Sequence, residues 1–230
     1  PRGYASCGIP AVGSYEKEKR LAVVFNELHK AQLERGISDA SLVMRPSQIE
    51  QLMAFLQLMV KWNRVYNLSA IKEPEEMVSL HLLDSLSVLP FLHGKRCIDV
   101  GTGAGLPGLP LAIAKPEVEF VLLDSNSKKT RFIQQVCIEL GLKNVEPLHE
   151  RVENYNPEQK FDTVIARALS ALPNLLTKTR HLLLDGGKLL AMKSKETDEL
   201  VRDDFQFDEV KALNIAGLDA TRNLVIYTAK

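Results

Sequence analysis

A short buried strand that runs directly into a glycine-rich loop is the feature that most constrains the fold of this chain. Residues 97–100 read CIDV, the pattern of a buried strand, and the next five residues read GTGAG, with glycine at Gly101, Gly103 and Gly105. Glycine allows the sharp turn of such a loop and lets a ligand approach the backbone closely. In a parallel α/β sheet, a turn of this kind lies between the carboxyl end of the first strand and the following helix. The sequence therefore predicts a nucleotide-like ligand at this turn.

Beyond residue 95, short apolar runs alternate with amphipathic stretches. This alternation predicts βαβ units and a mostly parallel sheet with helices on both faces. The last two apolar runs are separated by only six residues, which predicts an antiparallel hairpin that closes the sheet. The expected strands are 96–100, 119–123, 145–148, 161–165, 187–192, 205–215 and 222–228, and the expected helices are 106–114, 127–140 and 171–184.

The residues before 95 carry no strand pattern and are expected to be helical. In the stretch that starts at Pro46, apolar side chains recur at three- and four-residue steps, as on one face of a helix. Pro46, Ser47 and Glu50 resemble a helix start with a capping box. The expected helices are 16–35, 46–66 and one that begins after Pro74.

The spacing of the glycines separates the candidate ligands. A dinucleotide-binding loop, G-x-G-x-x-G, would need glycine where this chain has Leu106, and the chain has no G-x-x-x-x-G-K-[ST] phosphate loop. The G-x-G-x-G spacing is that of S-adenosylmethionine-dependent methyltransferases with a Rossmann-like sheet. Asp124 ends the second expected strand, where a carboxylate can accept hydrogen bonds from both ribose hydroxyls. Asp99 has two interpretations, a contact with the methionine part of the cofactor or bonds to local backbone.

These patterns together predict an α/β fold of the Rossmann-like class I methyltransferase type. It has a mostly parallel seven-stranded sheet, an antiparallel C-terminal hairpin and a helical N-terminal extension. We expect residues 1–20 to form a segment without assigned function, residues 21–94 a helical N-terminal region, and residues 95–230 the S-adenosylmethionine-binding methyltransferase domain. The acidic stretch 150–153 suits binding of the adenine edge, and a charge favoured at a helix N-terminus explains it as well.

The residues after the fourth expected strand, 166–170, are where this architecture meets the methyl acceptor. They lack the Asp/Asn-Pro-Pro-aromatic turn common in enzymes that methylate exocyclic amines. Methylation of a cytosine carbon needs a cysteine nucleophile, and Cys97 and Cys137 are better explained as core residues. Guanine N7 is a suitable acceptor because its lone pair needs no general base and alignment with the methyl group is sufficient. Arg167 can then hydrogen-bond guanine O6 or contact the carboxylate of the cofactor.

Charge and composition limit the partners. The net charge is zero, but residues 196–230 carry eight acidic and four basic residues, which leaves 25 basic and 21 acidic residues before them. This mild bias permits RNA binding without requiring it. Three scattered cysteines indicate neither a disulfide framework nor a metal site and favour a reducing cytoplasm, and no apolar run reaches membrane-spanning length. Basic clusters that border the expected site are Lys61, Arg64 and Lys72; Lys128, Lys129 and Arg131; and Lys193 and Lys195.

Seven short motifs are specific in combination. They are KWN at 61–63, YNL at 66–68, HLLDS at 81–85, IDVGTGAGLPG at 98–108, LLDS at 122–125, RVE at 151–153 and ARA at 166–168. With these motifs the chain, from about residue 25 to its C-terminus, resembles the bacterial glucose-inhibited division protein B family. That resemblance implies S-adenosylmethionine-dependent methylation of guanine N7 in 16S ribosomal RNA, near the decoding centre of the small subunit.

The resemblance also implies roles for particular residues and partners. It implies a substrate cleft with Arg167 and a polar cluster of His81, Asp84 and Ser85. The expected partner is 16S ribosomal RNA or the small ribosomal subunit, with no DNA, membrane or metal, and the protein is expected to be a cytoplasmic monomer. The implied cofactor contacts are Gly101, Leu106, Val152, Glu153 and Arg167, with Asp124 beside them.

Other interpretations stay open at this point. The chain could methylate a substrate of another class, a small molecule or a protein, or could bind S-adenosylmethionine as a sensor without turnover. An NAD oxidoreductase is a more distant alternative, since such an enzyme would share Asp124. Naked RNA, an assembly intermediate and a finished subunit are all candidate substrates.

Overall fold

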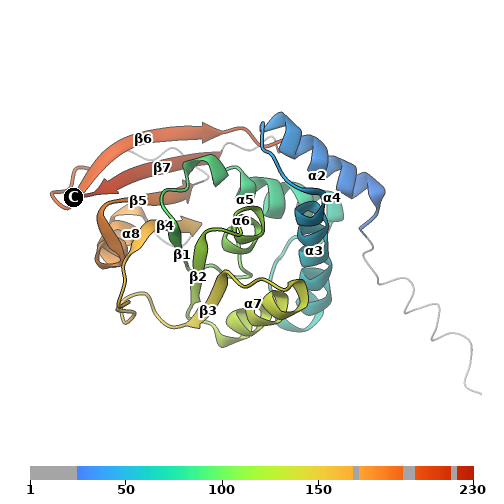
Figure 1. Ribbon diagram of the computed structural model, residues 1–230, viewed down its shortest axis with the longest axis horizontal. Coiled ribbons are helices and arrows are strands. Elements are labelled where there is room, and N and C mark those ends of the chain that lie inside the picture. Colours follow the sequence, from blue (N-terminus) through green and yellow to red (C-terminus); the bar gives the residue numbers. More distant parts are fainter. Residues whose placement is uncertain (1–24, 168–170, 194–199, 219–221) are drawn as a thin grey trace, which may run out of the picture.

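A seven-stranded sheet with helices on both faces forms the body of the protein (Figure 1). The computed structural model describes residues 25–167, 171–193, 200–218 and 222–230. The segment 1–20 and the first part of the helix expected over 16–35 lie outside the described residues.

The sheet has the strand order β3-β2-β1-β4-β5-β7-β6. The first five strands in this order pair in parallel, whereas β7 pairs antiparallel with both β5 and β6. The predicted mostly parallel seven-stranded sheet with an antiparallel C-terminal hairpin is therefore confirmed. The strands are β1 (Arg96–Val100), β2 (Glu119–Asp124), β3 (Val145–His149), β4 (Phe161–Arg167), β5 (Leu183–Lys193), β6 (Phe205–Leu213) and β7 (Arg222–Ala229).

The helices divide into an N-terminal group and a group that connects the strands. Those expected over 46–66 and 127–140 have the predicted bounds, and the helix expected over 16–35 continues to Asp39. The N-terminal helices are α2 (Glu27–Asp39), α3 (Pro46–Tyr66), α4 (Pro74–Met77), the π-helix η1 (Val78–Leu83), α5 (Asp84–Leu86) and the 3-10 helix η2 (Leu89–Phe91). The connecting helices are α6 (Gly108–Ala114), α7 (Ser127–Leu140), α8 (Leu172–Thr179) and the 3-10 helix η3 (Arg180–Leu182).

Side chains alternate between the two faces of the sheet and build two hydrophobic cores. In β5, Leu189 and Ala191 belong to one core, whereas Leu190 and Met192 belong to the other. The first core includes the apolar face of α8, and the second includes the apolar faces of α2, α3, α6 and α7. The N-terminal helices therefore share one core with the sheet, which holds them in a fixed position beside it.

Two local predictions were wrong. The capping box expected from Ser47 and Glu50 does not form. Instead the backbone N–H of Arg45 donates to the side-chain oxygen of Gln48 at 2.8 Å. The helix expected over 171–184 ends early, because β5 already begins at Leu183 and pairs with Phe161 of β4. The strand was expected to begin at Gly187, but the ladder already includes Leu183 and has a register irregularity before Lys188.

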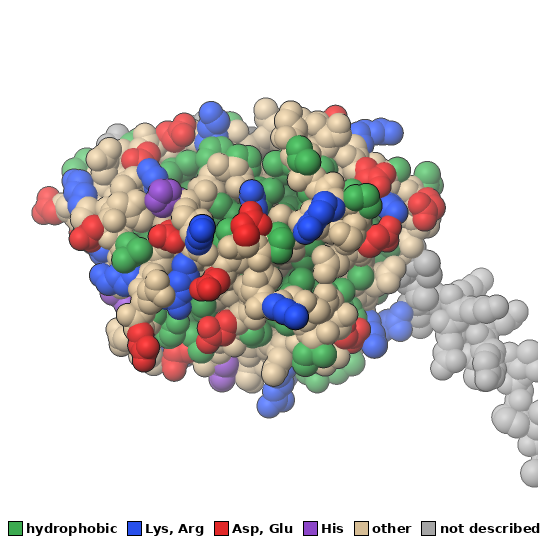
Figure 2. All heavy atoms as spheres, in the orientation of Figure 1, with side chains coloured by type: hydrophobic (Ala, Val, Ile, Leu, Met, Phe, Trp, Pro, Cys, Tyr) green, Lys and Arg blue, Asp and Glu red, His purple; other side chains and the backbone are tan. Residues whose placement is uncertain are grey.

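The surface carries charges of both signs. Figure 2 shows basic and acidic side chains interspersed over the face that it presents. Among the described residues, no helix has the length and apolar character needed to cross a membrane.

Gln48 fastens the N-terminal helices to the sheet layer, and its replacement tests this attachment. Its buried side chain donates to the carbonyls of Ile113 and Ala114, at the end of α6, at 2.8 and 2.9 Å. Gln48→Ala should lower the free energy of unfolding by about 2–3 kcal/mol, because these carbonyls lose buried donors. Gln51→Ala is the matched control, since this neighbour donates one half-buried bond, to Leu140, at 3.0 Å. Urea unfolding measures both variants, and equal losses would contradict the assignment.

Candidate functional site

The glycine loop after β1 is held against the end of β2. The backbone N–H groups of Gly101 and Thr102 both donate to the carbonyl of Leu123, at 2.8 and 3.1 Å. Gly101 and Gly103 have φ values of +70° and +62°, a region that glycine enters without strain. The loop backbone therefore adopts conformations that are unfavourable for residues other than glycine. It lies at the carboxyl edge of the sheet.

Asp99, inside β1, organises the loop from below. Its Oδ2 accepts hydrogen bonds from the Thr102 hydroxyl at 2.7 Å and from the Gly108 N–H at 2.8 Å. The carboxyl group has no exposed surface, and within the described part of the chain its Oδ1 has no hydrogen-bond partner. Burial raises the pKa of Asp99 to about 6, and the bonds from Thr102 and Gly108 partly oppose that rise. The local-backbone interpretation of Asp99 thus accounts for one of its two oxygens.

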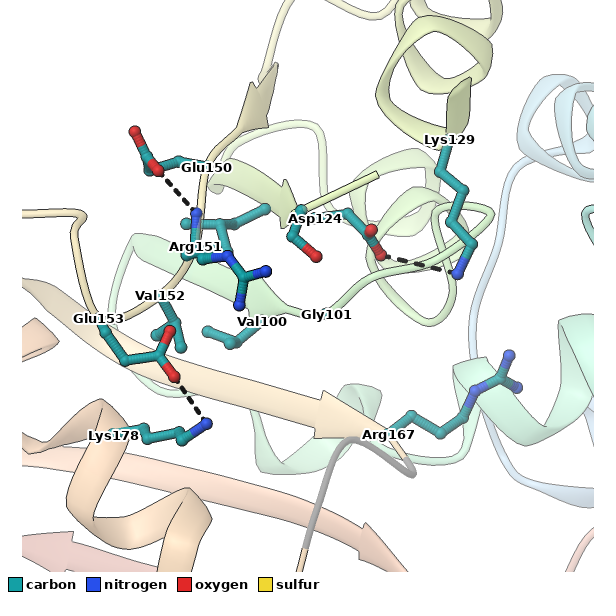
Figure 3. A pocket seen from close by; sticks show the side chains of 12 residues that line it. Val100, Gly101, Asp124, Lys129, Glu150, Arg151, Val152, Glu153, Arg167 and Lys178 are labelled. Atoms are coloured by element: carbon teal, nitrogen blue, oxygen red, sulfur yellow. Dashed lines mark hydrogen bonds and ion pairs between the residues drawn. The ribbon is translucent and has the colours of Figure 1, made fainter. Parts of the chain in front are cut away.

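A pocket of about 480 Å³ opens above the ends of β1 and β2 (Figure 3). Its volume lies within the range of small-molecule sites. Five of the residues expected to bind the cofactor line it, and its walls carry both charged and apolar side chains. The lining residues are Val100, Gly101, Leu123, Asp124, Ser125, Lys129, Glu150, Arg151, Val152, Glu153, Arg167 and Lys178.

Asp124 lies at the pocket with both carboxylate oxygens already bonded once. Its Oδ2 accepts from the Gly103 N–H and its Oδ1 from the Asn126 N–H, each at 2.8 Å. The ammonium group of Lys129 is 3.9 Å from Oδ2. Because a carboxylate has about four lone-pair sites, these contacts leave acceptor capacity for hydroxyl groups of a ligand.

The residues after β3 form the opposite wall. Val152 is buried and belongs to the core on the α8 side of the sheet. The carboxylate of Glu153 forms an ion pair with Lys178 of α8 at 2.6 Å, visible in Figure 3. The hydrogen bond from Lys178 lowers the pKa of Glu153. Glu153 therefore lines the pocket, and its carboxylate is already paired with a lysine.

Three predicted cofactor residues shape the loop without lining this pocket. Gly103 gives its N–H to Asp124. A side chain at Gly105 would come within 2.3 Å of Leu109, so this position is closed to larger residues. Leu106 is buried in the core beneath the loop. The structure brings Gly101, Asp124, Val152, Glu153 and Arg167 together at the pocket.

Arg167, the last residue of β4, connects this pocket to a buried carboxylate. Its Nη1 donates to Asp84 Oδ2 at 3.0 Å and to the Leu80 carbonyl at 3.1 Å. Arg222, the first residue of β7, donates from Nε to the other oxygen of Asp84 at 3.2 Å. Asp84 is only 3% exposed and sits between two guanidinium groups. In Figure 3 the Arg167 side chain extends away from Glu153 and Lys178.

A second pocket of about 350 Å³ shares Arg167 with the first. It contains His81 and Asp84 of the predicted polar cluster, whereas the buried Ser85 hydroxyl donates to the His81 carbonyl within the helix. The carbonyl of Leu80 and the ring of His81 come from the π-helical stretch η1, a kind of turn that is frequent at functional sites. The lining residues are Ile71, Leu80, His81, Asp84, Arg167, Met192, Lys193 and Arg222.

His81 is neutral in this environment. Its ring is 4% exposed, and Nε2 lies 2.9 Å from the Ser69 hydroxyl. Burial, and to a smaller extent the positive charge of Arg167, lower the pKa of His81 to about 4. Within the described part of the chain, its Nδ1 has no hydrogen-bond partner.

Two charged side chains at the pockets, those of Arg222 and Lys178, were not identified from the sequence. Arg222 begins the predicted hairpin strand, and β7 runs antiparallel to β5, so its first residue lies at the carboxyl edge of the parallel strands. The predicted antiparallel hairpin could therefore have placed Arg222 near the site. Lys178 lies in the last turn of α8 and carries no comparable signal.

The remaining predicted residues have varied positions. Cys97 is buried, and Cys137 packs against a core, as expected. Among the basic clusters, Lys129 and Lys193 line pockets, whereas Lys195 lies outside the described residues. Within the described chain, no group of three His, Cys, Asp or Glu side chains is placed to hold a metal ion.

Comparison with known proteins identifies a family and a fold. A family model described as rRNA small subunit methyltransferase G matches residues 48–225. Ribosomal RNA small subunit methyltransferase G of Chromobacterium violaceum is 48% identical over 202 residues, which cover 86% of this chain and 97% of the relative. The protein of the same description from Nitrosococcus oceani is 50% identical over 196 residues, with coverage of 84% and 92%.

Two solved structures share the fold at low sequence identity. A SAM-dependent methyltransferase from Aquifex aeolicus aligns with a TM-score of 0.52 and 18% identity, covering 67% of this chain and 93% of that one. Magnesium protoporphyrin IX methyltransferase from Synechocystis, solved with bound SAM, aligns with a TM-score of 0.53 and 16% identity, with coverage of 82% and 99%. These two likenesses concern the fold alone.

The raised pKa of Asp99 gives a pH-dependent prediction. In the unfolded chain an aspartate titrates near pH 4, and in the folded protein Asp99 titrates at about 6. Between these values the folded state binds more protons, so the contribution of Asp99 to stability falls as pH rises from about 4 to 6. Asp99→Asn removes this titration. The free energy of unfolding of the variant, relative to the parent, should rise by about 3 kcal/mol across that window.

Urea unfolding at several pH values between 4 and 7 measures this difference. Asp185→Asn is the matched control because Asp185 is exposed and pairs only with Arg180 among the described residues. Its difference from the parent should stay nearly constant. A constant difference for Asp99→Asn would contradict a raised pKa at this position.

Proposed function

Because the chain belongs to the rRNA small subunit methyltransferase G family, we propose that it transfers the methyl group of S-adenosylmethionine to guanine N7 in 16S ribosomal RNA, near the decoding centre. The proposal includes action on the small subunit or its RNA by a cytoplasmic monomer. The observation that favours N7 as the methyl acceptor is the weak basicity of the side chains that line the second pocket.

Those side chains include no ready proton acceptor among the described residues. The carboxylate of Asp84 is neutralised by Arg167 and Arg222, and the imidazole of His81, with its pKa near 4, is a weak base. Methylation of an exocyclic amine or a hydroxyl releases a proton that must be accepted. Guanine N7 has a lone pair in the ring plane and releases none, so a pocket without a base suits it.

The first pocket suits the cofactor in its chemistry as well as its size. Val100 and Val152 offer apolar surface for an adenine ring, and Asp124 retains acceptor capacity for ribose hydroxyls. Asp99 does not line the pocket but lies beneath the glycine loop, and its Oδ1, buried without a partner in the described chain, is an acceptor of the kind that an ammonium group satisfies. S-adenosylmethionine supplies an electrophilic methyl group on its sulfonium when bound. Arg167 borders both pockets, so the residues of the two sites are held in one arrangement.

The second pocket suits a purine base. Ile71, Leu80 and Met192 are apolar surfaces that can cover the faces of a ring, and the cationic side chains supply donors for O6. Nη1 of Arg167 donates to Asp84 and to the Leu80 carbonyl, and the guanidinium group has further N–H donors. We therefore assign Arg167 to positioning of the guanine. Asp84 acts through it by fixing the guanidinium, and His81 lines the same pocket as a neutral ring.

Methyl transfer to small-subunit RNA that lacks the modification tests the proposal. Label from S-adenosylmethionine should appear in 16S RNA and map to the N7 of one guanine. The assay compares naked RNA, an assembly intermediate and the finished subunit, which separates the candidate substrates. Label that appears only on protein or a small molecule would contradict the proposal. Binding of S-adenosylmethionine without turnover on any of the three would indicate a sensor.

Asp124→Ala tests the proposed ribose contact. The variant should bind S-adenosylmethionine more weakly by about 1–3 kcal/mol, because the hydroxyls lose a charged acceptor. Asp124 also holds the Gly103 and Asn126 amides, so the loss alone is ambiguous. The two causes are separated by calorimetry with a second ligand that lacks a ribose hydroxyl, so that the change in the protein and the change in the ligand form a double cycle. The parent should lose affinity for that ligand and the variant should not, and equal losses in both proteins would refute the contact.

A further inference from the structure

An aromatic pair at the carboxyl end of α3 lies partly at the surface, with Trp62 half-buried and Tyr66 exposed. The rings of Trp62 and Tyr66 stack with centroids 5.2 Å apart and an interplanar angle of 26°. Trp62 also packs on the buried Phe132 of α7, so the pair has a rigid base. Tyr66 is 37% exposed, and Val65 beside it is 73% exposed. Among the described residues, this stack is therefore a partly exposed aromatic surface with a buried base.

The pair stands between elements that line both pockets. Asn63, in the same turn, donates to the Ser69 carbonyl at 2.8 Å and accepts from the Ser69 N–H at 2.9 Å. The Ser69 hydroxyl reaches His81 at 2.9 Å and accepts from the N–H of Ile71, which lines the second pocket. On the other side, α3 packs against α7, whose first turn carries the pocket residue Lys129 (Figure 1). Asn63 and Ser69 therefore connect the turn that carries the aromatic pair to the second pocket.

The charge around the pair is suited to a polyanion. Lys61 and Arg64 lie on the same last turns of α3, and Lys72 lies in the loop that follows it. Lys128 and Arg131, in the first turns of α7, are also exposed. A strand of nucleic acid needs such cations for its phosphates and aromatic rings for its bases. A protein partner would be expected to cover the apolar surface without this concentration of basic residues.

We propose that Tyr66, backed by Trp62, is a stacking platform for an unpaired base of the RNA strand beside the target guanine. This inference rests on the proposed function, because it assumes an RNA substrate in the second pocket. Recognition of RNA commonly uses splayed bases that stack on aromatic side chains. The stack would hold the neighbouring nucleotide while the target base enters the pocket, and it would add affinity to a chain of zero net charge.

Binding of unmethylated small subunits and their extracted RNA to Tyr66 variants tests the platform. Tyr66→Ala should weaken binding by roughly 5- to 150-fold, the effect of removing one base stack. Tyr66→Phe keeps the ring and should bind as the parent does. Tyr66→Leu keeps apolar packing on Trp62 and should bind weakly. Ile138→Ala is the matched control, because Ile138 is an exposed apolar residue on another helix, α7, and this variant should leave binding unchanged.

The same variants separate this inference from the proposed function. Affinity for S-adenosylmethionine and the rate of methyl transfer at saturating RNA should stay close to those of the parent, with the loss confined to KM. A parent protein that methylates 16S RNA while Tyr66→Ala binds it normally would overturn the platform alone. A parent that methylates no RNA would overturn the proposed function first. A loss shared by Tyr66→Leu and Tyr66→Phe would overturn stacking as the cause.

Two direct readouts identify the occupant. Trp62 is the single tryptophan of the chain, so its fluorescence should be quenched when RNA stacks on the pair. Ultraviolet crosslinking to unmethylated small subunits should add a nucleotide to the tryptic peptide 65–72, in which Tyr66 is the one aromatic residue. A crosslink from this peptide to a ribosomal protein, or unchanged fluorescence on binding, would overturn the inference.

Discussion

The site depends on one buried carboxylate, that of Asp84, held between two arginines. Burial of a charge is costly unless it is paired and hydrogen-bonded, and removal of one partner leaves that cost uncompensated. Arg167 comes from β4 and Arg222 from β7, the strands on either side of β5. Asp84 therefore fastens the N-terminal helices across the end of β5. The second pocket exists because this contact fixes a helix above the edge of the sheet.

Much of this architecture could be predicted from the sequence, because it depends on local patterns. Alternating apolar runs predicted the strands, and Gly101 with Asp124 predicted the edge at which the first pocket lies. The GxGxG spacing also separated the ligand classes, since a side chain at Leu106 excludes a dinucleotide loop. These predictions agree with the structure because each one depends on a few consecutive residues.

Other features of the site could not be predicted, because they depend on residues far apart in the chain. Asp84 and Arg222 are separated by 138 positions, and no local pattern indicates that they meet. The π-helical turn that carries His81 is similarly hidden, since its apolar spacing resembles that of an ordinary helix. The Glu153–Lys178 ion pair joins a loop to a helix across the pocket. In each case, tertiary packing decides a contact between residue types that are common on protein surfaces.

The position of β7 has a consequence for the order in which the protein becomes complete. In the sheet, β7 lies between β5 and β6, although β6 precedes it in the chain. During synthesis, β6 would leave the ribosome with no neighbour to pair with, and the edge of β5 would stay open until the final strand entered between them. The cofactor pocket draws its described lining from residues before 179, whereas the second pocket requires Arg222. The described residues that line the pocket for the methyl donor would thus be synthesised before the last residue that lines the pocket for the acceptor.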